Sequence, residues 1–260
     1  MCPSPRGWAA SLWLLFCLSC SHDGAAPVAA PKYNVLFITL DTTRADRLGL
    51  YGFDQPTSPF LDQLSRDGIV FTRAISQAAV TNTSHASLFT GLYPYNHGVR
   101  FLLDQRHAVL DESMVTTAEV FKRAGADTAA FISAVPASSD FGFQQGFDVF
   151  DEAFEKSGRI AQRGGKDTAD RAISWLRQTE GPFFCWVHFF DPHDPKLMPP
   201  FEICDRFRPA DLSDDSAKLR AIYKAEISYM DMQIERILKV LEESGVALQH
   251  PRNTEIAAAA

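Results

Sequence analysis

The chain has 260 residues, of which 46% are hydrophobic and 22% charged, and its formal net charge is -7. This length suits one large α/β domain or two small ones, and the composition predicts a buried core and excludes general disorder. The negative charge argues against nucleic acid as the main partner, because binding a phosphate backbone requires clustered Lys and Arg.

The N-terminus, residues 1–20, is predicted to be an export signal. Arg6 precedes an apolar run at 8–18, which is shorter than the roughly 20 residues that cross a bilayer. Small residues before Cys20 resemble a bacterial lipoprotein cleavage site, which would give a lipid anchor at that cysteine; simple secretion and a plain membrane anchor are the alternatives. An Ala/Pro linker follows at 21–32. We expect an exported protein, in the periplasm, on the outer membrane as a lipoprotein, or secreted.

Strand-like and helix-like segments alternate from residue 33 to residue 245, which predicts a layered α/β domain. The first segment is the apolar run at 35–40, typical of a strand that is covered on both faces. A helix follows, with Ser58 as its N-cap and Pro59 at its first position, and then a strand at 69–71.

The same alternation continues further along the chain. Thr116 and Glu119 form the capping box of a helix that ends at Gly125. The remaining expected elements are a strand at 128–132, a helix at 167–178, an aromatic-rich strand at 183–190 and a long helix at 216–243. Residues 246–260 contain no clear strand pattern and are interpreted as a tail.

Cys185 and Cys204 are the two cysteines outside the export signal. An oxidising compartment allows a disulfide between them. Two ordinary thiols are an equal alternative, because the sequence does not show whether the two Cα atoms come close enough.

Two predicted strands end in acidic residues, Asp41 and Asp191. In open α/β sheets, ligands bind at the carboxyl ends of the strands, and an aspartate there can ligate a divalent cation. The alternative is that each aspartate caps the turn or helix that follows it.

A second candidate site combines small hydroxyl residues with a histidine. Thr81 and His85 stand at the start of a short predicted helix that Gly91 ends. A hydroxyl there faces free N–H groups and can attack as an alkoxide if a metal lowers its pKa; an ordinary helix cap is the alternative. His193, between two prolines, can protonate a leaving group or lie in a surface turn. His188, on an apolar strand, is interpreted as a satisfied core histidine.

Several segments in fixed order resemble the N-terminal domain of bacterial sulfatases, in the alkaline phosphatase superfamily. They are NVLFITLDTTRADRLGLYG, TSHASLFTGLYPYNHGV, FGFQQGFDVFDE, HFFDPHDP and AEISYMDMQIERIL, within residues 33–245. The resemblance implies a mixed, mainly parallel sheet flanked by helices. It also implies hydrolysis of sulfuric esters with a bound divalent cation, which the sequence does not identify among Ca, Mg, Mn and Zn.

The resemblance also implies roles for individual residues. Asp41 matches the first metal-ligand aspartate, and Thr42 stands where a second aspartate is usual. Thr81 occupies the position of a Cys or Ser that the family converts to formylglycine; in related phosphodiesterases a threonine is both nucleophile and metal ligand. His85 stands where Arg is usual, and His193 matches an active-site histidine near the leaving group. The implied catalytic residues are therefore Thr81, His85 and His193, and the implied metal ligands are Asp41 and Thr81.

The family pattern continues past the long helix into a strand and an Asp-His pair of metal ligands, which we do not find after Gly245. We therefore expect an incomplete metal site and an open sheet edge. Three interpretations stay open: a sulfuric ester hydrolase that is incomplete in this chain, a phosphodiesterase or phosphoryl transferase with a threonine nucleophile, and a non-catalytic exported remnant. The expected substrate is a sulfate or phosphate ester of a small molecule or glycan.

Overall fold

A computed structural model describes residues 33–100, 108–154, 161–193 and 197–245, together with the backbone of a strand at 255–259. The predicted export signal, with Cys20, and the predicted linker lie outside the described residues. Within the described ranges, every helix is too short or too polar to span a bilayer.

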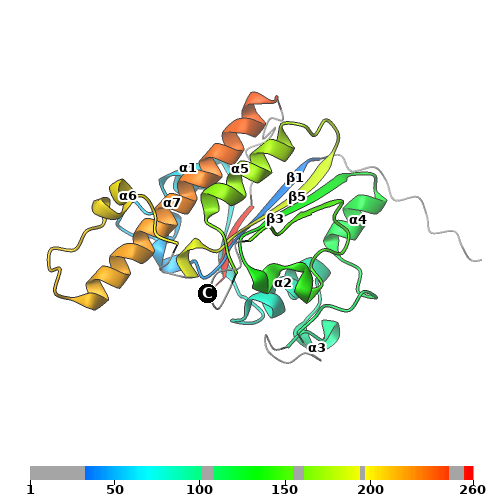
Figure 1. Cartoon of the computed structure of the whole chain (residues 1–260), viewed down its shortest axis with the longest axis horizontal. Coiled ribbons are helices and arrows are strands. Elements are labelled where there is room, and N and C mark those ends of the chain that lie inside the picture. The colour runs from blue at the N-terminus through cyan, green and yellow to red at the C-terminus, as the bar shows by residue number, and fades with distance from the viewer. Residues whose placement is uncertain (1–32, 101–107, 155–160, 194–196, 246–254, 260) are drawn as a thin grey trace, which may run out of the picture.

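Four parallel strands form the main sheet, in the order β1-β5-β3-β4 (Figure 1). Their bounds are Val35–Leu40 for β1, Asp127–Ile132 for β3, Val149–Asp151 for β4 and Phe183–Phe189 for β5. Because all four strands run in the same direction, their carboxyl ends share one edge of the sheet. Asp41 and Asp191, which follow β1 and β5, therefore both lie at that edge, as the α/β prediction requires.

Helices cover both faces of this sheet, with α5 (Gly165–Leu176) and α7 (Asp215–Glu243) on one face and α2 (Thr81–Thr90) and α4 (Thr117–Arg123) on the other (Figure 1). Alternate side chains of β5 enter the two cores, as the two-residue period of a strand requires. Cys185, Val187 and their neighbours pack with α5 and α7, whereas Phe184 and Trp186 pack with α2 and α4. By the same alternation His188 points to the α2 side.

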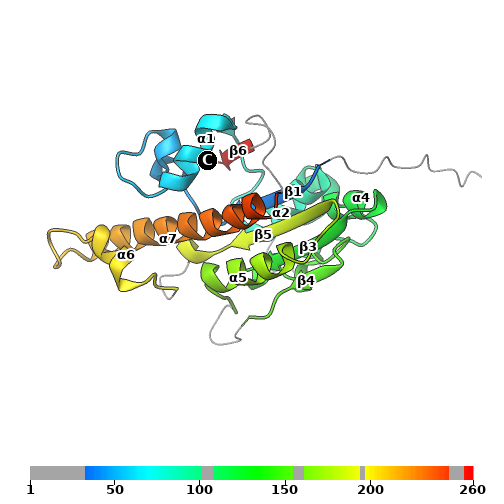
Figure 2. The same ribbon diagram turned by 90° about the horizontal axis from the view of Figure 1, so that it is seen from above.

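The other elements lie around this frame. They are α1 (Pro59–Asp67), β2 (Ile69–Ala74), α3 (Pro94–His97), α6 (Phe201–Arg206), β6 (Glu255–Ala259) and the 3-10 turns η1 (Ala45–Arg47), η2 (Gly49–Tyr51), η3 (Val135–Ala137), η4 (Ser139–Phe141) and η5 (Asp191–His193). In Figure 2, α1 and β6 lie next to each other on the side of α7 that faces away from α5.

Most predicted elements are present with nearly the predicted bounds. β1 and the capping box of α4 are confirmed: Thr116 Oγ1 accepts a hydrogen bond from Glu119 N at 3.2 Å, and Glu119 Oε2 accepts one from Thr116 N at 2.8 Å. β1 is covered on both faces, as expected: Leu36, Ile38 and Leu40 pack against the core under α5 and α7, and Val35 and Phe37 against the core under α2 and α4. The six residues of β1 are half-buried, because β1 lies at one edge of the described sheet and has a neighbour on one side only.

Ser58 is the N-cap residue of α1 and Pro59 its first residue, as predicted, but the side chain of Ser58 does not do the capping. Ser58 makes no capping hydrogen bond to this helix, and its hydroxyl instead contacts Asp62 Oδ1 at 2.9 Å. Asp231 on α7 takes over the capping, since its two carboxylate oxygens accept hydrogen bonds from Phe60 N and Leu61 N, both at 2.9 Å. A residue 170 positions away in the sequence therefore fixes the start of α1, which no local pattern indicates.

Residues 255–259, which the sequence pattern assigned to a tail, form β6 and pair with β2 in a second, parallel sheet. An alanine run has no alternation of polar and apolar residues, so only the backbone hydrogen bonds offered by β2 decide this strand. Of the two alternatives for the cysteines, the structure shows two thiols and not a disulfide. Cys185 lies within the core, and Cys204 is half-buried.

Candidate active site

Asp41 and Thr81 meet at the carboxyl edge of the sheet. Asp41 N donates to Phe189 O at 2.9 Å, which extends the β1–β5 pairing by one residue, and Thr81 is the first residue of α2. Burial raises the pKa of Asp41, but the neighbouring His188 imidazole, the His85 imidazole and the Thr81 hydroxyl together outweigh it, so that its pKa lies below the ordinary value. Asp41 is therefore a carboxylate at neutral pH.

His188 is part of this cluster, which corrects its interpretation as a satisfied core histidine. Its side chain is fully buried and Nε2 lies 3.5 Å from Asp41 Oδ2. Within the described part of the chain, neither ring nitrogen has a partner at hydrogen-bond distance. Buried polar atoms are nearly always paired, so an imidazole left with only a long contact to a carboxylate is a strong indication of a ligand site.

His85 lies against His188, with 5.2 Å between the ring centroids. Its Nδ1 is 2.8 Å from Thr81 O, and because a carbonyl oxygen only accepts, Nδ1 carries the proton. Nε2 then presents a lone pair, and it is buried with no hydrogen-bond partner among the described residues. Burial, and next the charge of His188, lower the pKa of His85 to about 4. His85 is thus a neutral base or ligand, unlike the cationic arginine that the family usually places here.

His193 stands apart from this cluster. It is exposed and stacks on Phe190, with 4.1 Å between the ring centroids and an angle of 18° between the rings. Phe190 in turn lies 6.0 Å from His188. The structure therefore brings Asp41, Thr81 and His85 together, adds His188 to them, and leaves His193 separated from them by the Phe190 ring.

Asp191 contacts the start of the earlier helix α5, whereas the alternative for the strand-end aspartates was a cap on the turn or helix that follows each of them. Asp191 Oδ1 accepts a hydrogen bond from Gly165 N at 2.9 Å, at the first residue of α5, while Oδ2 is buried without a partner in the described ranges. Burial raises the pKa of Asp191 to about 6. A Cβ atom on Gly165 would lie 2.8 Å from Oδ2, so this contact requires glycine.

The loop after Asp41 is strained and held from α7. Thr42 has φ of 53°, a left-handed conformation that is an outlier for a β-branched residue and typical of functional sites. Tyr223 clamps this loop, because its hydroxyl donates to Thr42 O at 2.7 Å and accepts from Arg44 N at 2.9 Å. The sequence gives no signal for this role of Tyr223, which lies on the long helix far along the chain.

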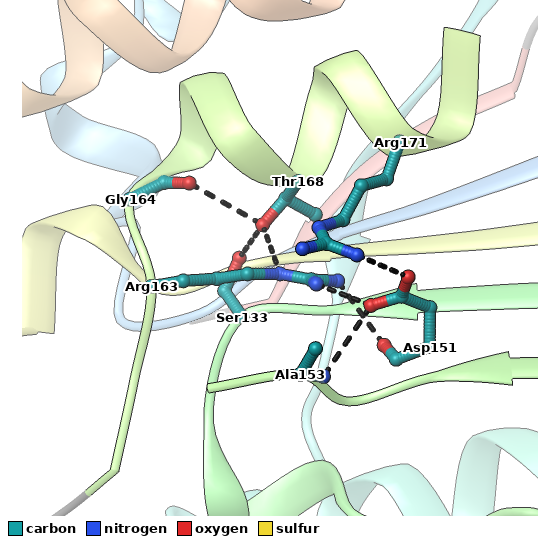
Figure 3. A network of polar contacts seen from close by, with 7 residues as sticks. All are labelled: Ser133, Asp151, Ala153, Arg163, Gly164, Thr168 and Arg171. Atoms are coloured by element: carbon teal, nitrogen blue, oxygen red, sulfur yellow. Dashed lines mark hydrogen bonds and ion pairs between the residues drawn. The ribbon is translucent and has the colours of Figure 1, made fainter. Parts of the chain in front are cut away.

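A buried ionic network holds the start of α5 against the sheet (Figure 3). Asp151, at the end of β4, accepts hydrogen bonds from Arg163 and, at 2.9 Å, from Arg171. Arg163 also reaches Thr168 Oγ1 at 3.0 Å, and Thr168 is 2.7 Å from the Ser133 hydroxyl beyond β3. The network therefore joins the ends of two strands to the helix whose first residue contacts Asp191.

The donor set fits a divalent cation in part. Asp41 and Thr81 offer oxygens, and His85 and His188 offer buried nitrogens with no hydrogen-bond partner. In the described ranges, however, no group of three His, Cys, Asp or Glu side chains is placed to hold a metal ion. A divalent cation takes about four to six ligands, so these residues by themselves form an incomplete site.

The parallel sheet with its cluster at the carboxyl edge defines an α/β fold of the sulfatase and alkaline phosphatase type. The phosphonate monoester hydrolase of Agrobacterium radiobacter shares it, with a TM-score of 0.66 and 22% identity over 87% of this chain and 61% of that one. The Sulfatase family model matches residues 33–249, and the chain belongs to the sulfatase family.

Curated relatives agree with this family. An ulvan-active sulfatase of Formosa agariphila is 25% identical over 205 residues, which cover 70% of this chain and 39% of the relative. The iduronate 2-sulfatase of Homo sapiens is 23% identical over 332 residues, which cover 94% of this chain and 59% of the relative. The chain thus spans 39% to 59% of the length of these two relatives.

Proposed function

We propose that this protein hydrolyses sulfuric esters, with Thr81 as the nucleophile and with Asp41 and Thr81 as oxygen ligands of a divalent cation. The observation that carries the proposal is the contact between the Thr81 hydroxyl and the Asp41 carboxylate, the two residues that the motif resemblance predicts to be metal ligands. The proposal concerns the whole protein, and the described residues supply the nucleophile together with part of the metal site.

The start of α2 suits the sulfate group of a substrate. The positive end of a helix dipole attracts a tetrahedral anion, and Thr81 presents its hydroxyl there. A bound cation would supply Lewis acidity and lower the pKa of this hydroxyl. The same helix end then orients the sulfur atom toward Thr81 Oγ1.

The proposed reaction has two steps. In the first, Thr81 Oγ1 attacks sulfur, the bond from sulfur to the alcohol oxygen breaks, and the alcohol leaves with a proton from His193. The Thr81 proton passes to His85 Nε2, which is neutral and carries a lone pair. In the second step water attacks the sulfur of the sulfated threonine and gives one proton to His193, while His85 returns its proton to the Thr81 oxygen. Hydrogen sulfate leaves, and the Thr81 hydroxyl and both histidines are restored.

Names of the relatives support a sulfated small molecule or glycan as substrate, since they include sulfatases of ulvan, of N-acetylgalactosamine 6-O-sulfate and of iduronate 2-sulfate. The predicted export signal agrees with an extracytoplasmic glycan. We propose an exported protein, with Cys20 as the site of a lipid anchor if the signal is of the lipoprotein type. Mass spectrometry of the mature N-terminus tests this, because an unmodified chain that starts elsewhere would exclude the anchor.

Turnover of 4-nitrophenyl sulfate with Ca²⁺, Mg²⁺, Mn²⁺ or Zn²⁺ tests the chemistry. We expect turnover that Thr81→Ala abolishes and Thr81→Ser retains in part, because serine keeps the hydroxyl. Faster cleavage of bis(4-nitrophenyl) phosphate would favour the phosphodiesterase alternative, which threonine itself supports since it needs no conversion to formylglycine. A folded chain that cleaves neither ester with any of the metals would contradict the proposal and support the non-catalytic alternative.

A further inference from the structure

A second, cationic pocket lies between the segment after β1 and the helices α6 and α7. Its volume is about 980 Å³, and its lining includes one acid, Asp54, and six basic residues: Arg44, Arg47, Arg206, Arg208, Arg220 and Lys224. The whole chain carries a net charge of -7, so this pocket gathers charge opposite to that of the molecule. A cleft lined by one sign of charge concentrates ligands of the other sign.

Two of these cations lack an acidic partner. Arg44, Arg47, Arg208 and Arg220 each form an ion pair with a nearby aspartate. Lys224, which is half-buried, has neutral partners instead: Nζ donates to Gln55 Oε1 at 2.9 Å and lies 5.9 Å from the centroid of a phenylalanine ring in the pocket wall. In the described ranges neither Lys224 nor the exposed Arg206 forms an ion pair, so an anion is the partner that this pocket lacks.

The walls between these cations are partly aromatic. Phe53, Phe207 and Tyr223 all line the pocket. Flat aromatic faces pack against the C–H faces of sugar rings, while guanidinium and ammonium groups bind sulfate and carboxylate oxygens. This combination suits an anionic sugar better than a small inorganic anion, which makes no use of apolar walls.

The chain segment that follows β1 connects the candidate active site to the pocket. β1, which ends at Asp41, continues directly into the pocket residues Arg44 and Arg47. Tyr223 belongs to the pocket wall and also donates its hydroxyl hydrogen to Thr42 O at 2.7 Å. A ligand in the pocket therefore lies against the loop that directly follows the metal-ligand aspartate.

We infer that this pocket binds a second anionic group of the same substrate, a sulfate or carboxylate on a sugar ring next to the ester that Thr81 attacks. The inference rests on the proposed function, and it identifies the substrate as an anionic glycan that carries at least two charged groups. Free sulfate shares the anionic chemistry but not the sugar ring.

Isothermal titration of the full chain at low salt tests the inference, with a heparin-derived hexasaccharide, neutral maltohexaose and inorganic sulfate as probes. We expect the hexasaccharide to bind much more tightly than either of the others. Lys224→Met and Arg206→Gln should each weaken this binding by about tenfold, the usual loss for a hydrogen bond to a charged group. Arg177→Ala removes an equal charge from an exposed position on α5's C-cap and should change the affinity less than about twofold.

Three results would overturn the inference: no hexasaccharide binding by the wild type, equal affinity in the Lys224→Met, Arg206→Gln and wild-type proteins, or full competition by inorganic sulfate at matched concentration. Arg206 is exposed, so its substitution keeps the test decisive if Lys224→Met fails to fold. The titration measures affinity and not turnover, so its outcome does not depend on Thr81 acting as the nucleophile. Loss of turnover in the assay of the proposed function, with intact and Lys224-dependent binding, would therefore contradict the Thr81 chemistry and not the pocket.

Discussion

His188 Nε2 lies 3.5 Å from Asp41 Oδ2, across two neighbouring parallel strands that end at the same edge of the sheet. Thr39 lies opposite His188 in the register, so Asp41 begins the loop just beyond this pair. The contact joins a fully buried imidazole to a carboxylate that is a proposed metal ligand. It therefore extends the candidate site from the start of α2 to β5.

Replacing this imidazole should separate function from stability. His188→Phe keeps a ring of similar size in an aromatic core and removes two nitrogens that have no hydrogen-bond partner in the described ranges. We expect the free energy of unfolding to change by less than about 1 kcal/mol, while kcat/KM for the sulfate ester falls by about tenfold or more. Urea unfolding and steady-state kinetics measure the two quantities.

His97 is the matched control for that substitution. Its Nε2 is 2.9 Å from the Ser87 hydroxyl and its Nδ1 accepts from Val99 N at 3.1 Å, so this buried histidine is satisfied. His97→Phe should cost about 1–3 kcal/mol in the free energy of unfolding, because it leaves both partners unpaired. Equal losses of stability in the two variants would show that His188 is only a structural residue.

The carboxylate of Asp231 should stabilise α1 from a distance. Asp231→Ala removes the acceptor for Phe60 N and Leu61 N, and we expect a loss of about 1–2 kcal/mol, as for other helix caps. Asp67→Ala, an exposed aspartate in the last residue of the same helix, should change stability by less than about 0.5 kcal/mol. Thermal unfolding of both variants measures these changes in stability. An Asp231→Ala variant that is as stable as the wild type would contradict the capping role.

Asp191 should make stability depend on pH between about 4 and 6. Burial raises the pKa of Asp191 from 3.8 to about 6, so the folded state holds this proton more tightly than the unfolded state. The stability that the proton contributes is fully present below pH 3.8 and is lost as the pH rises through about 6. The loss is on the order of 3 kcal/mol at most, from two pKa units at about 1.4 kcal/mol each.

Asp191→Asn removes this titration and keeps an oxygen for Gly165 N. Above pH 6 we expect the variant to be more stable than the wild type, and below pH 4 the two should converge. Asp231, whose pKa burial also raises to about 6, is present in both proteins, so the difference between their stability curves isolates Asp191. Parallel curves from pH 4 to pH 7 would sink this prediction.

The buried pair of Arg163 and Asp151 should contribute far more than an exposed pair. Arg163→Met leaves a largely buried carboxylate with only Arg171 as its cation, and we expect a loss of about 3–5 kcal/mol in the free energy of unfolding. Lys166→Met breaks an exposed pair with Asp170 and should cost less than about 1 kcal/mol. Denaturant unfolding of the two variants gives the comparison. Similar losses in the free energy of unfolding would show that burial of Arg163 does not strengthen its ion pair.

Local patterns predicted the elements well where the contacts that fix an element lie within a few residues of it in the sequence. The Thr116 and Glu119 box, Gly91 as the end of α2 and the bounds of β1 are all confirmed, because capping and strand periodicity act over a few residues. The capping contact of α1 and the strand β6 were missed. Their partners, Asp231 and β2, are remote in the sequence, and an alanine run has no pattern of its own.

The candidate site shows the same division. Its motifs named Asp41, Thr81 and His85, and the structure places these three together; their catalytic roles stay predictions. The part of His188 was missed, because the sequence shows an apolar strand and not which face of it meets Asp41. His193 was expected beside the leaving group, and the structure stacks it on Phe190, apart from the other three residues.

By itself, the sequence determined the α/β class, the family and the residue types at the carboxyl ends of the strands, because these follow from periodicity and from motifs of neighbouring residues. Only the tertiary structure decided which polar groups are left without partners and which cations converge on one pocket. Whether a polar group finds a hydrogen-bond partner, and whether a charge is neutralised, depends on all the elements that pack around it. Most of those elements are remote in the sequence, so local patterns do not reveal them.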